Sequence, residues 1–215
     1  MSPALPDPLG EAVARIRDGG LLAYPTETVW GLGADARRDP AVERLRAWKG
    51  RPTGAPISIL VEGLGALEGL GLEAGPVARE LATKFWPGPL TLVLPGRGGF
   101  ARGVARADGA VGVRCSSHPL AAALARRLRA EDVGPITATS LNRSGGAPVA
   151  TREQAERLCS GVPDAPQLIG VERAEAGGAG ESTVLDLAGP EPLVLRWGLI
   201  GEAELLPVLE AVAGA

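Results

Sequence analysis

The sequence has few aromatic residues and very little cysteine or histidine. Phe, Trp and Tyr make up 3% of the 215 residues, so the hydrophobic 45% must build a mainly aliphatic core. The two cysteines, Cys115 and Cys159, are too few for a disulfide framework, and we expect both to be reduced core residues. His118 is the only histidine and no Cys-x-x-Cys motif occurs, which argues against a metal site built from protein side chains.

Long apolar runs and a targeting segment are also missing. The N-terminus lacks a basic stretch followed by an apolar run, so it does not read as a signal peptide. A membrane-spanning helix needs a run of about 18 apolar residues, and the sequence contains none. These absences predict a cytoplasmic protein without a membrane partner.

The charge of the chain is weakly acidic but unevenly distributed. The net charge of -3 and the pI of about 5.4 argue against a protein that coats nucleic acids, since such affinity comes mainly from neutralising phosphates. Residues 97–129 nevertheless hold seven arginines and one acid, and residues 37–51 hold six basic residues and two acids. These clusters are either a patch that binds phosphates or ordinary solvated helix faces, and the second interpretation is favoured for most of the arginines.

The length of the chain favours a single domain over residues 1–215. Strands and helices alternate irregularly, which predicts an α/β fold with a mixed, α+β-like sheet and not a regular doubly wound one. Residues 172–180 are rich in Gly, Ala and charge, and are predicted to form a loop. Apolar periodicity and cap residues predict helices at 8–17, 40–48, 76–85, 119–129, 151–158 and 202–212. β-Rich runs predict strands at 21–24, 57–61, 90–94, 110–114, 135–139, 167–171, 183–187 and 193–196.

The segment of residues 24–33, YPTETVWGLG, is the first that suggests chemistry. Thr26 and Thr28 offer hydroxyls to a small polar ligand, and Gly31 and Gly33 would let the backbone approach it closely. The alternative is an ordinary junction between a strand and a helix, with a Thr or Glu cap.

Two further segments carry groups suited to phosphates. Lys49-Gly-Arg51 follows a predicted helix and resembles a phosphate clamp, although it would also complement the dipole of that helix. Residues 137–146 contain Ser140, Asn142 and two glycines, which can present donors to phosphates or simply form a polar turn. This loop lacks the Walker A pattern. Two later segments, residues 181–186 and 195–198, are undistinguished alone, and an arginine such as Arg196 is usually a surface residue.

No nucleophile triad can be assembled from the sequence. His118 precedes a proline and reads as a helix-start residue, and no acid has an obvious partner. This favours chemistry carried by positioning and electrostatics, as phosphoryl and nucleotidyl transfer permit.

Together and in this order, the segments resemble the YrdC-like family, the threonylcarbamoyl-AMP synthases. The resemblance runs from about residue 9 to residue 199, and a C-terminal helix at 202–212 follows. The matching segments are PTETVWGLG with Trp30 in place of the usual Tyr, Lys49-Gly-Arg51, WPGPLTLVL, Val113-Arg114, Ser140-Leu-Asn142, Glu181-Ser-Thr and LRWG.

The resemblance implies a twisted open sheet around a deep cavity and a nucleotidyltransferase that condenses L-threonine, bicarbonate and ATP with release of pyrophosphate. By the same resemblance, Thr28, Arg114 and Ser182 hold L-threonine, and Arg51, Ser140 and Arg196 hold ATP. Lys49 and Asn142 complete the two short motifs, so that Lys49, Arg51, Ser140 and Asn142 form the catalytic set. Mg2+ accompanies the triphosphate, and the product passes to a tRNA threonylcarbamoyl transferase complex.

Some features leave alternatives open. Ala55, Leu60 and Val149 stand where the family often has Asn, His and Ser, and the chain resembles the short form without an added C-terminal domain. There are two alternative functions. One is an RNA-binding relative without catalysis, with weak RNA binding, and the other is a related carbamoyl-adenylate enzyme with another substrate. Residues 172–180 are predicted to act as a lid, because Ser182 follows them directly and the reactive intermediates need shielding from water.

Overall fold

The computed structural model of the chain describes residues 7–52, 54–169, 175–177 and 180–213. Six α-helices lie in this part of the chain, and each matches a predicted helix to within one residue at either end. Two short 3-10 turns, Leu64–Ala66 and Glu68–Leu70, were not predicted. None of the described helices is both long and apolar enough to cross a membrane. The helices are α1 (Pro8–Arg17), α2 (Asp39–Lys49), α3 (Pro76–Phe85), α4 (Pro119–Ala130), α5 (Arg152–Cys159) and α6 (Glu202–Ala213).

The strands form two mixed sheets, which confirms the predicted α/β class. A four-stranded sheet has the order β7-β2-β1-β8, and a six-stranded sheet has the order β10-β9-β4-β5-β3-β6. Parallel pairs join β1 to β8, β3 to β5 and β4 to β9, and the other pairs are antiparallel. The strands are β1 (Leu22–Pro25), β2 (Trp30–Gly33), β3 (Ile59–Leu60), β4 (Leu90–Leu94), β5 (Val111–Arg114), β6 (Ile136–Thr137), β7 (Thr139–Ser140), β8 (Gln167–Leu168), β9 (Thr183–Asp186) and β10 (Leu193–Arg196).

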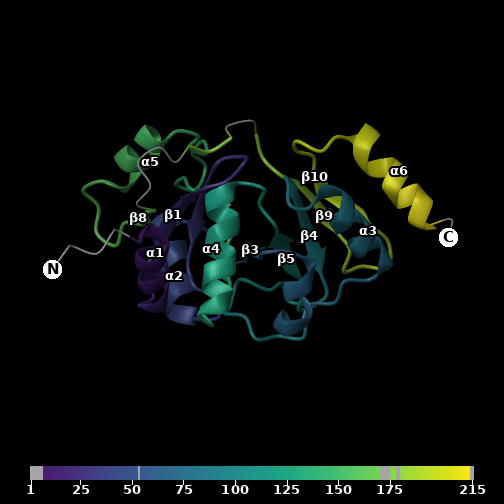
Figure 1. The fold of residues 1–215 in the computed structure, drawn as a ribbon, viewed down its shortest axis with the longest axis horizontal. Coiled ribbons are helices and arrows are strands. Elements are labelled where there is room, and N and C mark those ends of the chain that lie inside the picture. Colours follow the sequence, from purple (N-terminus) through teal and green to yellow (C-terminus); the bar gives the residue numbers. More distant parts are fainter. Residues whose placement is uncertain (1–6, 53, 170–174, 178–179, 214–215) are drawn as a thin grey trace.

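The helices cover the two sheets from outside. Figure 1 shows α1, α2 and α4 beside the four-stranded sheet, whereas α3 and α6 lie beside the far end of the six-stranded sheet. Helix α1 packs on α4 and β1, and α3 packs on β4 and α6. The cap residues agree with the sequence: Thr151 and Gln154 form a capping box at α5, and His118 caps α4.

The single strand predicted at residues 135–139 is in fact two strands in different sheets. β6 pairs with β3, and β7 pairs with β2. At Ala138, between them, the backbone N–H donates to the carbonyl of Ser58 over 2.6 Å. The chain therefore crosses from one sheet to the other here, and it delivers Ser140 to the space between the sheets.

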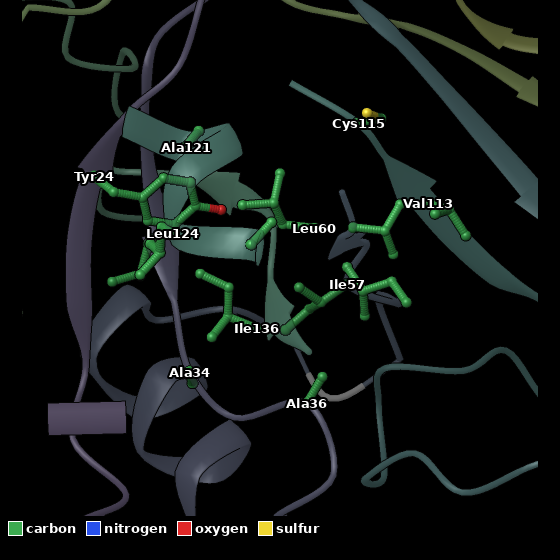
Figure 2. Close-up of a cluster of buried hydrophobic side chains, with 14 of the residues drawn as sticks. Tyr24, Ala34, Ala36, Ile57, Leu60, Val113, Cys115, Ala121, Leu124 and Ile136 are labelled. Carbon is green, nitrogen blue, oxygen red and sulfur yellow. The ribbon is translucent and has the colours of Figure 1, made fainter. Parts of the chain in front are cut away.

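A core of mainly aliphatic side chains lies beneath this crossing, as the composition predicts. Figure 2 shows Ile57, Leu60, Val113 and Ile136 packed together, with the Tyr24 ring at one side of the cluster. The Tyr24 hydroxyl donates to the carbonyl of Thr137 over 3.0 Å, so its polar atom is satisfied inside the core. Both cysteines are free and buried, in agreement with the sequence.

The two glycines of β2 have a packing role that the sequence did not reveal. A Cβ at Gly31 would lie 2.8 Å from Cζ of Tyr24, and a Cβ at Gly33 would lie 3.1 Å from Cε1 of the same ring. The ring on the neighbouring strand therefore gives these glycines a packing reason, in addition to the close approach of a ligand that the sequence suggested. Strand β2 was missed in the sequence because its two glycines are unfavourable in a strand interior.

We expect Gly31→Ala to destabilise the protein by about 1–3 kcal/mol, because the new methyl group overpacks against the Tyr24 ring. Urea unfolding measures this change, and combining the substitution with Tyr24→Leu should cost less than the sum of the two single changes. Gly65→Ala is the matched control, since a Cβ there meets no atom within 4 Å. Purely additive effects of the first two substitutions would contradict the proposed clash.

Candidate functional site

A cavity of about 440 Å³ lies between the two sheets, and all eight residues predicted for the site line it. They come from both sheets and from segments far apart in the sequence. Lys49 ends α2, Arg114 ends β5, Ser140 ends β7 and Arg196 ends β10. The other four are Thr28, Arg51, Asn142 and Ser182.

Lys49 is held by the loop that contains the Ser-x-Asn motif. Its ammonium donates to the Oδ1 atom of Asn142 over 2.6 Å, to the carbonyl of Asn142 over 3.2 Å and to the carbonyl of Ser140. The Ser140 hydroxyl also donates to Asn142 Oδ1 over 2.7 Å. The amide nitrogen of Asn142 donates to the carbonyls of Arg143 and Gly146 over 3.0 and 2.6 Å. Lys49 thus uses its three donors to hold this loop at the cavity wall.

The environment of Lys49 disfavours its charged form. Only 3% of the residue is exposed, and burial, together with the positive charge of Arg51, lowers its pKa from 10.5 to about 8, against the opposing effect of Glu181. Among the described residues Lys49 has no carboxylate partner in hydrogen-bonding range, so an anion that enters the cavity would stabilise its charged form. The site is therefore electrostatically prepared for a negatively charged ligand.

Arg51 is anchored by backbone carbonyls alone among the described residues. Its Nη2 donates to the carbonyl of Pro56 over 2.8 Å, and its Nε donates to that of Ala55 over 3.4 Å. Burial, with a contribution from the charge of Arg46, lowers the pKa of Arg51. Because Ala55 contributes only its carbonyl, the side chain that the family often has at this position is not needed to orient Arg51.

Arg196 is not the ordinary surface residue that its place at a strand end suggested. Its Nε and Nη2 donate to the carbonyl of Ser182 over 3.1 and 2.9 Å, and Nη2 also donates to the Ser182 hydroxyl over 3.2 Å. Nη1 pairs with Glu181 over 2.9 Å, and 41% of the Arg196 side chain stays exposed. The guanidinium therefore folds back over Ser182 at the rim of the cavity.

A second cluster surrounds Arg114, which is 7% exposed. Its Nη2 donates to Glu27 Oε1 over 2.7 Å and lies 3.4 Å from the Thr28 hydroxyl. Burial disfavours the carboxylate form of Glu27, but the charge of Arg114 and the hydrogen bond from Ser116 outweigh it and hold its pKa below the usual value. The Thr28 hydroxyl also lies 2.9 Å from that of Thr26. A cation and several hydroxyls are thus gathered on this side of the cavity.

Sequence reasoning missed three polar residues of this cluster, namely Glu27, Thr91 and Ser116. The Thr91 and Ser182 hydroxyls lie 2.9 Å apart, and Thr91 is the cross-strand partner of Arg114. The period of two in a strand identifies Thr91 as a residue facing the same side as Val93, but which strand lies next to it is a non-local property. Glu27 was visible as a carboxylate in a candidate segment, without an indicated partner.

Four of the seven arginines in residues 97–129 pair with acidic side chains and do not line the cavity, and two of them, Arg127 and Arg129, lie on α4 as exposed residues, as the favoured interpretation predicts. Arg97, Arg102, Arg127 and Arg129 each pair with acidic side chains. Arg106 is an exception, because it lines the cavity while it pairs with Asp108 and Asp186.

The predicted lid falls largely outside the described residues, which omit 172–174 and 178–179. Its described part contacts the site: the Gly177 N–H donates to the carbonyl of Thr26 over 2.9 Å, and the Glu175 carbonyl lies 2.9 Å from Nε2 of His118. Closure over the cavity remains a prediction.

Comparison with known proteins assigns the family. A family model named Sua5_yciO_yrdC and described as telomere recombination matches residues 14–198. This chain belongs to the Sua5/YciO/YrdC family. The crystal structure of Pyrococcus abyssi Sua5 complexed with L-threonine superposes with a TM-score of 0.84 at 34% identity, and the match covers 96% of this chain and 59% of that one.

Two curated relatives of this chain are named threonylcarbamoyl-AMP synthase. The Bacillus subtilis protein is 36% identical over 212 residues, which are 96% of this chain and 56% of the relative. The Stenotrophomonas maltophilia protein is 38% identical over 162 residues, which are 73% of this chain and 85% of the relative. This chain therefore spans little more than half the length of the first relative and most of the second.

Proposed function

We propose that this chain is a threonylcarbamoyl-AMP synthase, a nucleotidyltransferase that condenses L-threonine, bicarbonate and ATP and releases pyrophosphate for the N6-threonylcarbamoyladenosine modification of tRNA. One observation carries the proposal. Eight polar residues from segments spread between Thr28 and Arg196 line a single cavity of about 440 Å³. The curated relatives with this name and the threonine complex of the Pyrococcus abyssi structure support it.

The threonine end of the cavity is the cluster around Arg114. A guanidinium whose Nη2 is already engaged by Glu27 still has other N–H groups for the carboxylate of an amino acid. Thr28 and Ser182 supply hydroxyls that can donate to or accept from the hydroxyl of threonine. Together they match a zwitterion that carries a side-chain hydroxyl.

The ATP end is the side with Arg51, Ser140 and Arg196, next to Lys49 and Asn142. Three cationic side chains line this part of the cavity, and Glu181 is the acidic residue beside them. Fixed positive groups in a partly dry cavity stabilise the charge that develops on transferring phosphates. The triphosphate binds here.

The reaction joins the two ends. The amine of threonine gains the carboxyl group of bicarbonate with loss of water, giving a carbamate. A carbamate oxygen then attacks the α-phosphorus of ATP, and the bond to the bridging oxygen breaks, so that pyrophosphate leaves. Arg114 positions the amino acid, and Arg51 and Arg196 position the phosphates, so that the two reacting atoms meet within one cavity.

Magnesium enters with ATP as part of the substrate. The described residues contain no group of three or more His, Cys, Asp or Glu side chains that could hold a metal ion. Mg2+ prefers substrate phosphates, waters and one or two carboxylates to a cage of protein ligands, and Glu181 is a carboxylate that lines the cavity. The ion neutralises part of the triphosphate charge when it is bound.

The alternatives are an RNA-binding relative without catalysis and a related carbamoyl-adenylate enzyme with a different substrate. Four arginines of residues 97–129 already pair with acidic side chains outside the cavity, which favours the enzyme over an RNA-binding role. In our proposal the protein is a single cytoplasmic domain, and its product passes to a tRNA threonylcarbamoyl transferase complex.

The test is pyrophosphate release from ATP and Mg2+, measured with and without L-threonine and bicarbonate. We expect release to require both, and 2-aminobutyrate, which lacks the hydroxyl, to react roughly tenfold more slowly because buried hydroxyls lose their partner. Equal rates with the two amino acids would exclude threonine as the preferred substrate. Release without any amino acid would argue against the reaction itself.

A further inference from the structure

Glu27 is a buried carboxylate that does not line the cavity but contacts a residue that does. Its side chain is 16% exposed, and its Oε1 accepts from Nη2 of Arg114 over 2.7 Å. Its other oxygen accepts from the hydroxyl of Ser116. Both carboxylate oxygens therefore have hydrogen-bond partners within the protein, and Glu27 binds the Arg114 guanidinium from outside the cavity.

The guanidinium of Arg114 is only partly used by the protein. Nη2 contacts Glu27 and Thr28, whereas Nε is buried without a hydrogen-bond partner among the described residues. Unsatisfied buried donors are uncommon and call for an explanation. A carboxylate in the cavity would complete the hydrogen bonding of this side chain after a small adjustment.

The far end of the network is also fixed. The Ser116 hydroxyl, which donates to Glu27, accepts the backbone N–H of His118 over 3.2 Å. The His118 ring accepts from the N–H of Leu120 through Nδ1, so in the neutral ring Nε2 carries the proton and donates to the Glu175 carbonyl over 2.9 Å. Glu27 is thus tied through Ser116 to the start of α4 and to residues 175–177.

We propose that Glu27 is a positioning residue for substrate recognition, which fixes the Arg114 guanidinium so that it reads the carboxylate of the amino-acid substrate. The inference rests on the proposed function and adds a specificity determinant to it. Glu27 itself touches no substrate, and its effect passes through Arg114.

Two effects of removing Glu27 oppose each other, and the geometry decides between them. Loss of the negative charge would make the cavity more positive and would favour an incoming carboxylate. Loss of the fixed partner would leave a long side chain with many rotamers to be ordered by the ligand. Because Arg114 is almost fully buried and its pairing with Glu27 is short and charge-assisted, orientation is the larger effect. Substrate binding should therefore weaken.

The experiment compares L-threonine with L-threoninol, in which CH2OH replaces the carboxylate, in the pyrophosphate assay. For Glu27→Ala we expect the KM for threonine to rise at least about tenfold, with the KM for ATP changed less than twofold. The preference of the wild type for threonine over threoninol should shrink by a similar factor. Glu27→Gln, whose amide oxygen can still accept from Arg114, should have a KM for threonine between those of the wild type and Glu27→Ala.

Controls separate this role from a loss of folding and from failure of the proposed function. Glu62→Ala breaks the pair with Arg129 away from this cavity and should leave both kinetic constants unchanged. Equal losses with threonine and threoninol would show that Glu27 serves only stability, and a lower KM for threonine would show that Glu27 competes with the substrate for Arg114. Either result overturns the inference while the wild type stays active. A wild type inactive with threonine, bicarbonate and ATP would instead contradict the proposed function.

Discussion

Replacing Lys49 by methionine is expected to lower the rate of pyrophosphate release at least about a hundredfold. The ammonium of Lys49 holds three oxygen atoms of the Ser140-Leu-Asn142 loop, and methionine keeps the length of the side chain without the donors. The carbonyls of Ser140 and Asn142 would lose this donor, and each buried acceptor left without its partner costs about 1–3 kcal/mol, so the loop would leave this position. A cost of about 2.7 kcal/mol in the transition state corresponds to a hundredfold slower reaction.

Lys84 is the matched control, because it is the only other lysine of the chain and lies exposed on α3. Lys84→Met should leave the rate within about twofold of the wild type. A Lys49→Met protein that reacts nearly as fast as the wild type would show that the loop is held without the ammonium.

The same lysine predicts a dependence of stability on pH. The pKa of Lys49 is about 8 in the folded protein and 10.5 in the ordinary lysine, so between these values the unfolded chain binds the proton that the folded chain has released. The free energy of unfolding contributed by this group therefore increases as the pH rises from about 8 to about 10.5. Urea unfolding at several pH values should show this increase in the wild type relative to Lys49→Met, and parallel curves would argue against the lowered pKa.

The helices could be predicted because their signals are local. The capping box of Thr151 and Gln154, the proline at the start of α3 and the apolar spacing of α1 all lie within the segment that they define. Strand β2 and the division between β6 and β7 were missed, because they depend on which strand lies alongside. Gly31 shows the difference, because the Tyr24 ring, which lies on another strand, leaves no room for a side chain at this position.

The site could be predicted only in part from its spacing. Lys49 meets Ser140 and Asn142 across 91 and 93 positions of the sequence, and no pattern within one segment indicates that contact. The resemblance to a family selected these residues, and the structure adds why they meet: the crossing at Ala138 carries β7 to the end of α2. Neither the motif spacing nor the family resemblance identified Glu27 and Ser116, because their partners are distant in the sequence and do not share a motif with them.

Leu60 and Val149, which depart from the family pattern, each make contacts that the fold explains. Leu60 is 2% exposed and packs among Ile57, Val113 and Ile136, so it belongs to the core as well as to the cavity wall (Figure 2). Val149 acts through its backbone, whose carbonyl accepts the N–H of Trp30 over 2.9 Å. The backbone contact of Val149 does not depend on the identity of its side chain.

Arg51→Ala and Arg196→Ala should each weaken the use of ATP by roughly ten- to a hundredfold, measured as kcat/KM for ATP. Both guanidinium groups line the cavity and are held mainly by backbone carbonyls, which leaves their charge available to phosphates. A lost charge-assisted hydrogen bond costs about 1.5–3 kcal/mol, which corresponds to that range of rates. Arg51 should show the larger effect, because Arg196 shares its charge with Glu181 and is partly exposed.

Arg127→Ala is the matched control for Arg51→Ala and Arg196→Ala. Arg127 lies on α4 and pairs with Asp7 and Glu131 at the surface, so its charge is already compensated away from the cavity. Exposed pairs of this kind contribute about 0–1 kcal/mol to stability, and the substitution should leave kcat/KM for ATP unchanged. If all three substitutions lowered kcat/KM equally, the effect would come from the overall loss of positive charge, which added salt would mimic. A loss confined to Arg51→Ala and Arg196→Ala would instead require contact with the nucleotide, because only these two side chains reach the cavity.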